Sequence, residues 1–165
     1  MTALIGVVIV VLVVAVIALI INGIEDYHKG KKKGIASFKD YLELTDLPII
    51  TFKQGKKKLN FILDSGANYS VINKEVEKEL KSEETSKQSA VLGIHGEVTR
   101  TNIKTISFSH GKDVFIEDFQ VMDISKTVSK YEKHKGVTIH GVLGNAFMQA
   151  YKYVIDFDEK IAYRK

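Results

Sequence analysis

Cysteine is absent from the 165-residue sequence, and proline occurs once. The lack of cysteine excludes disulfide bonds, thiolate catalysis and cysteine-based metal sites. The five histidines show no spacing of three or four residues and no His-Glu-x-x-His motif, which argues against a zinc hydrolase. Ser65 does not stand in a Gly-x-Ser-x-Gly motif, so a serine hydrolase is poorly supported. We expect neither a metal nor a cofactor.

A large excess of one charge is also missing. The sequence has 24 Lys and Arg against 20 Asp and Glu, and acidic residues are interleaved with basic ones from Asp26 onward. Phosphate binding favours a basic stripe with few acidic interruptions, so no nucleic-acid partner is expected. The length allows one compact domain with a short appendage.

Charges and proline are absent from residues 3–21, which are almost entirely aliphatic. Such a stretch makes a helix of roughly 28 Å, close to the hydrocarbon thickness of a bilayer. A cleaved signal peptide is the alternative, but it would have a basic start, a shorter apolar stretch and a small-x-small cleavage site. The pattern favours a retained anchor over residues 1–22.

Lysines follow this stretch, at positions 29 and 31–33, whereas the N-terminal flank has none. The positive-inside tendency predicts a single-pass protein of the cell membrane whose C-terminal domain is cytoplasmic. The lysines form either a solvated linker or a contact with anionic lipid headgroups. Three glycines between residues 23 and 34 indicate a flexible tether, which we place at 23–46, before a domain at 47–165.

Short apolar or alternating runs dominate the rest of the chain. They predict strands at 48–53, 59–63, 89–95, 97–108, 114–122, 138–143, 153–157 and 161–163. Helical spacing predicts helices at 73–80 and 145–151. Many short strands with little helix favour a closed barrel or a sandwich. We expect Tyr69 and Phe147 to pack in the core, and Asp156 to occupy a hairpin turn.

The most informative segment runs from Phe61 to Ile72, where an apolar run ends in Asp64-Ser65-Gly66-Ala67. A carboxylate at the end of a buried strand is costly unless it is hydrogen-bonded, paired or functional. An Asx-type turn between two strands, with Asp64 merely capping a loop, is the alternative.

This segment resembles the active-site signature of the retropepsin-like aspartic proteases. Val142-Leu143-Gly144-Asn145 resembles the family's second signature, and Leu92 to Glu97 stands where the family has a glycine-bearing flap. The resemblance covers residues 47–165. It implies an all-β fold, a closed barrel of short antiparallel strands with one or two short helices.

The resemblance also implies roles for individual residues. Catalysis would fall to Asp64, Ser65 and Gly66, and support of the site to Val142, Leu143 and Gly144. Substrate would contact Ala67, Gly93, Ile94, His95 and Gly96, although a histidine at a loop tip is more often simply solvated.

The reaction of this family needs two aspartates, and the chain has one Asp-Ser-Gly and no internal repeat. We therefore predict a homodimer with Asp64 of each copy at the two-fold axis, acting on protein or peptide substrates. Confinement to a membrane would favour this pairing. The alternative is a membrane-tethered peptide-binding module that keeps the fold without turnover.

Overall fold

The computed structural model describes residues 13–20, 32–92 and 98–165. The chain forms two compact units, residues 1–32 and 33–165. In the first unit, residues 13–20 are helical. None of the helices in the described part is long and apolar enough to cross a bilayer. The expected anchor over residues 3–21 lies mostly outside the described residues, so it stays a prediction.

The second unit starts earlier than residue 47. β1 (Lys33–Ser37) and α2 (Lys39–Thr45) occupy a stretch for which the sequence predicts a flexible tether. β1 pairs with the distant β10, and Ala36 and Phe38 are buried. The structure of this stretch depends on its pairing with β10, which local composition does not reveal.

Seven strands form the main sheet: β2 (Ile49–Gln54), β3 (Lys57–Leu63), β4 (Ser70–Asn73), β5 (Ser82–Leu92), β6 (Val98–His110), β7 (Asp113–Met122) and β8 (Gly141–Leu143). Their order is β2-β3-β8-β4-β7-β6-β5, and an additional pairing of β2 with β6 closes six of them into a barrel. The predicted closed barrel is therefore confirmed. The prediction of antiparallel strands alone is wrong, because β3–β8 and β4–β7 are parallel.

A separate three-stranded sheet contains β1, β10 (Ile161–Arg164) and β9 (Tyr153–Asp156), in that order. Asp156, expected in a hairpin turn, is instead the last residue of β9, and its Oδ1 accepts a hydrogen bond from Glu159 N of that turn at 3.0 Å. The Arg164 side chain joins this sheet to the barrel through an ion pair with Asp113.

Helices are more numerous than expected, because α4 (Ser125–Lys135) accompanies α2, α3 (Lys74–Glu77) and α5 (Asn145–Tyr151). α5 has the predicted bounds. α3 is shorter than the predicted 73–80, and the side chain of its N-cap, Asn73, accepts from Glu75 N at 3.4 Å. α4 escaped prediction because its sequence is mostly polar and basic.

Phenylalanines fill the barrel. Phe52 and Phe108 meet edge to face, with ring centroids 5.2 Å apart, and Phe147 of α5 closes the same cluster. Phe147 is buried as predicted, but Tyr69 is 59% exposed, so its assignment to the core is wrong. Tyr69 lies between two strands, in a loop that turns away from the core.

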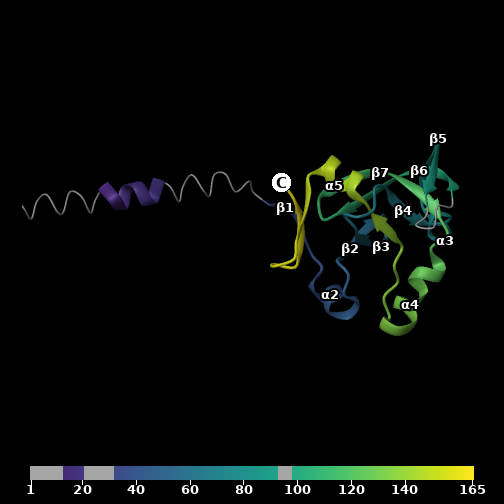
Figure 1. Cartoon of the computed structure of the whole chain (residues 1–165), viewed down its shortest axis with the longest axis horizontal. Helices are drawn as coiled ribbons and strands as arrows, with labels where there is room; N and C mark the ends of the chain where they lie inside the picture. The colour runs from purple at the N-terminus through teal and green to yellow at the C-terminus, as the bar shows by residue number, and fades with distance from the viewer. Residues whose placement is uncertain (1–12, 21–31, 93–97) are drawn as a thin grey trace, which may run out of the picture. The chain divides into compact units, whose positions relative to one another are not determined.

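A second apolar cluster lies outside the barrel. Helices α2 and α4 lie on the same side of the barrel and contact each other, as Figure 1 shows. The cluster has Ile49, Val137 and Ile139 at its centre, with Tyr41, Val128 and Tyr131 packed against it. Burial of these side chains holds α4 against the barrel, beside the end of β3.

Candidate active site

Two parallel strands bring the two sequence signatures together. β3 and β8 pair in the register Ile62 with Val142 and Leu63 with Leu143. Because adjacent parallel strands end at the same edge of a sheet, Asp64 and Gly144 follow them side by side. Asp64 N donates to Leu143 O at 3.0 Å, which ties the two strand ends directly.

The Asp64 side chain is fixed by its own turn. Its Oδ1 accepts a hydrogen bond from Gly66 N at 2.9 Å, and its carbonyl oxygen accepts from Ala67 N at 3.2 Å. These are the hydrogen bonds of an Asx-type turn, so the turn that the alternative interpretation expects is present. A capping turn leaves the second carboxylate oxygen available for chemistry.

Asp64 is exposed in the single chain, as are Ser65 and Gly66. The burial expected for a carboxylate at the end of a buried strand is therefore absent in the single chain. β3 ends at the surface of the barrel, and nothing within the described part of one chain covers the turn that follows.

The loop from Asp64 to Tyr69 is bonded to the start of α5. Asn145 N donates to Ala67 O at 2.7 Å, and Ala146 N donates to Asn68 O at 3.2 Å. Gly144 allows this close approach, since a Cβ there would lie 2.6 Å from Tyr69 O. Val142, Leu143 and Gly144 thus lie where they can support the Asp64 loop.

A buried carboxylate lies behind the loop. Ser70, which is fully buried at the start of β4, donates from Oγ to Glu117 Oε1 at 2.7 Å and accepts from Gly144 N at 3.1 Å. Burial raises the pKa of the Glu117 carboxyl, although the Ser70 hydrogen bond opposes the rise. Sequence reasoning missed Glu117, yet the alternation of Phe115, Glu117 and Phe119 on β7 places all three on the inward face.

An apolar groove of about 440 Å³ adjoins the turn, and its lining includes both Asp64 and Ser65. Most of its wall is aliphatic or aromatic, with contributions from Leu47, Pro48, Ile62, Val128, Tyr131 and Phe157. Sequence reasoning missed this wall because α4 was not predicted. Such a groove suits a large apolar side chain next to Asp64.

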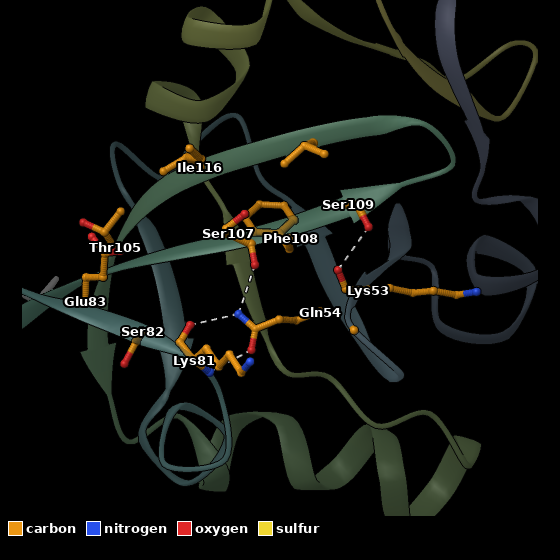
Figure 2. A pocket seen from close by; sticks show the side chains of 12 residues that line it. Lys53, Gln54, Lys81, Ser82, Glu83, Thr105, Ser107, Phe108, Ser109 and Ile116 are labelled. Atoms are coloured by element: carbon orange, nitrogen blue, oxygen red, sulfur yellow. Dashed lines mark hydrogen bonds between the residues drawn. The ribbon is translucent and has the colours of Figure 1, made fainter.

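A larger cavity, of about 500 Å³, lies at the opposite end of the barrel. Figure 2 shows Gln54 at its centre, where Nε2 donates to Lys81 O and Ser107 O at 2.9 and 3.0 Å. This cavity adjoins the start of β3, about 20 Å along the strand from Asp64. We assign the reaction site to the smaller groove, because of these two only it contains Asp64.

The remaining substrate-binding candidates stand in two places. Ala67 is half-buried in the Asp64 loop. Gly93, Ile94, His95 and Gly96 lie outside the described residues. Strands β5 and β6, which flank them in the sequence, pair with each other, with Leu92 opposite Val98. The role of these residues stays a prediction.

Comparison with known proteins gives one family. The family described as aspartyl protease matches residues 50–147, which include the Asp64 loop, Ser70, Glu117 and Gly144. No curated protein sequence matches the chain significantly.

Proposed function

This chain belongs to the aspartyl protease family, and from that premise we propose that it is a membrane-anchored endopeptidase that works as a homodimer. The observation that carries the proposal is the position of Asp64, which directly follows β3 beside Gly144 and lines an apolar groove. Fold alone does not establish activity, so the proposal rests on this site.

The proposed chemistry uses one Asp64 from each of two copies. Two carboxylates in contact hold one proton between them, because both cannot be charged at short distance. The ionised one takes a proton from a water, which attacks the peptide carbonyl, and the protonated one donates to the carbonyl oxygen. The tetrahedral intermediate then collapses as the amide nitrogen takes the proton that the first carboxylate removed from the water, and the second carboxylate takes back a proton from a hydroxyl of the intermediate. The products are a carboxylic acid and an amine.

The need for a second copy follows from exposure and chemistry together. Among the described residues, no hydrogen bond or ion pair joins the exposed Asp64 to a second acid, and the reaction needs one to protonate the carbonyl oxygen. A two-fold axis beside Asp64 would bring the two carboxylates together and cover both. Ser65 and Gly66 would then also lie at the axis.

Two features near Asp64 support such a contact. β9 is an edge strand of its sheet, so its outer backbone groups can pair with a second β9 across a two-fold axis. Tyr69 of the Asp64 loop and Phe157 after β9 are 59% and 57% exposed, which is high for aromatic side chains. We propose that the dimer covers both.

The substrate would be an extended peptide with a large apolar side chain next to the bond that is cut. The groove beside Asp64 would take this side chain, and the β5–β6 hairpin would cover the peptide. Burial of such a side chain contributes about 1.5–3 kcal/mol, enough to select among peptides.

The membrane anchor belongs to the same proposal. Residues 3–21 carry no charge, and the helical part at 13–20 exposes apolar side chains, Leu19 by 71%. A helix that is apolar all round is suited to lipid. We propose that the lysines at 29 and 31–33 keep the protease unit on the cytoplasmic side. Deletion of residues 3–21 should move the protein from the membrane fraction to the soluble fraction.

The direct test uses the full chain in detergent and a library of peptides. Wild type should cleave peptides with large apolar residues, and Asp64→Asn should lose on the order of 10⁴-fold in kcat/KM. Asp40→Asn, a change at an exposed aspartate of α2, is the matched control and should keep full activity. Equal cleavage by wild type and Asp64→Asn would remove the aspartate mechanism.

Mixing tests the dimer. Adding an equal amount of Asp64→Asn protein to wild type should reduce activity to about half, because random pairing converts half of the wild-type chains into mixed dimers. Undiminished activity after full exchange of subunits would show that one Asp64 suffices. Peptide binding without cleavage by wild type would favour the non-catalytic binding module instead.

A further inference from the structure

Glu117 is a buried carboxylate that the proposed reaction does not use. It is 9% exposed and stands on the inward face of β7 between Phe115 and Phe119. Burying a carboxylate among aromatic side chains is costly unless it is hydrogen-bonded. A carboxylate in this position therefore calls for an explanation beyond packing.

Its hydrogen bonds lead to the Asp64 loop. Ser70 Oγ donates a hydrogen bond to Glu117 Oε1 at 2.7 Å. Ser70 Oγ also accepts a hydrogen bond from Gly144 N at 3.1 Å. Ser70 ends the loop that begins at Asp64, and Gly144 follows the strand whose last carbonyl accepts from Asp64 N. Glu117 is thus linked through Ser70 to the place where the Asp64 loop meets the Gly144 turn.

A strong acceptor at position 117 sets the direction of this chain of bonds. A hydroxyl has one proton to donate, and Glu117 receives that of Ser70. The lone pairs of Ser70 are then left to face Gly144 N–H. Without the acceptor, the hydroxyl could rotate toward other oxygens and the Gly144 amide would lose its partner.

We propose that Glu117 is a positioning residue for peptide cleavage, holding the Asp64 loop and the Gly144 turn in register through Ser70. This assignment rests on the proposed function. Glu117 does not touch the substrate. It acts by fixing the loop from which the Asp64 carboxylate projects, and a displacement of about 1 Å in such a loop can reduce turnover by about 100-fold.

The test compares Glu117→Leu with Glu117→Gln in the full chain. The glutamine keeps an acceptor oxygen and should keep kcat close to wild type, whereas leucine should lower kcat by roughly 10- to 100-fold with KM unchanged. Ser70→Ala should resemble Glu117→Leu. The double variant should lose no more activity than the more impaired of the two single variants, because both changes break one chain of bonds.

Ile106→Val is the matched control. Ile106 is fully buried and lies opposite Glu117 on β6, but its side chain makes no hydrogen bond to the loops. This change should lower Tm without lowering kcat. If Glu117→Leu loses activity only in proportion to its loss of folded protein, as this control would, the positioning role is overturned.

Hydrogen exchange separates this inference from the proposed function. The Gly144 amide should exchange faster in Glu117→Leu than in wild type, and at the wild-type rate in Glu117→Gln. Faster exchange with unchanged kcat, or equal loss of kcat in both Glu117 variants, would overturn the inference. Wild type that cleaves no better than Asp64→Asn would instead overturn the proposed function, whatever the exchange data show.

Discussion

At the Asp64 end of the barrel, the backbones of two loops bond directly to each other, whereas at the Gly55 end the strands are joined through the side chain of Gln54. The Asp64 end has glycine where a Cβ would collide with backbone, and the Gly55 end leaves open space around its glycine. A side chain at Gly144 would therefore force the backbone to move, whereas a side chain at Gly55 would meet no neighbouring atom. Only the first end carries the proposed chemistry.

Replacing one glycine at each end should give the largest difference in activity between the two ends. In Gly144→Ala the new Cβ would lie 2.6 Å from Tyr69 O, so the Asp64 loop must move. We expect a fall in kcat/KM of about 100-fold. Gly55→Ala introduces no collision but strains a residue at φ 57°, which should cost about 1 kcal/mol of stability.

Peptide cleavage assays and thermal unfolding of both glycine variants check this prediction. The Gly55 variant should keep its kcat/KM despite a lower Tm. Full activity in Gly144→Ala would show that the register of the two loops does not matter for the reaction.

Changing one side chain in each of the two cavities should give a smaller difference between the two ends. Thr127 is exposed on α4 and lines the groove beside Asp64, so Thr127→Trp should raise KM for apolar peptides about tenfold. Thr127→Ala is its control and should leave KM near wild type. Gln54→Ala removes the bridge at the other end, and we expect it to cost about 1–2 kcal/mol of stability with kcat/KM unchanged.

Steady-state kinetics on a peptide with a large apolar residue, together with chemical unfolding, measure both effects. A Gln54 variant with impaired cleavage at full stability would mean that the far cavity takes part in the reaction.

The smallest expected effect is a dependence of stability on pH that arises from His140, which is bonded to the middle of β3. His140 Nδ1 accepts from Asn60 N at 3.0 Å, and burial lowers the pKa of His140. The folded protein therefore favours the neutral ring, and its contribution is complete above the unfolded-state pKa of about 6.5. As pH falls from there through the lower folded-state pKa, this contribution is lost, at a cost of about 1 kcal/mol for the hydrogen bond.

Unfolding by urea at pH 7 and at lower pH checks the sign. The loss should shrink in His140→Asn and persist in His134→Asn, which alters an exposed histidine on α4. An identical pH dependence in wild type and His140→Asn would assign the effect to other groups.

Several parts of this protein could be predicted because they depend on neighbouring residues. The apolar run ending at Asp64, the helix at 145–151 and most strands follow from periodicity within a few positions. The helix predicted at 73–80 was found for the same reason, although it ends at Glu77. β1, which pairs with the far end of the chain, gave no such signal.

By itself the sequence determined which carboxylate stands at a strand end before a glycine turn, which second signature would accompany it, and that one chain has one such aspartate. Only the tertiary structure decided that β3 and β8 lie in parallel, that α4 completes a groove beside Asp64, and that Glu117 is bonded to Ser70 behind the loop. The physical reason is that the pattern of neighbouring residues determines which element a side chain belongs to and which face it occupies. The partners of that side chain, in contrast, come from strands far away in the sequence.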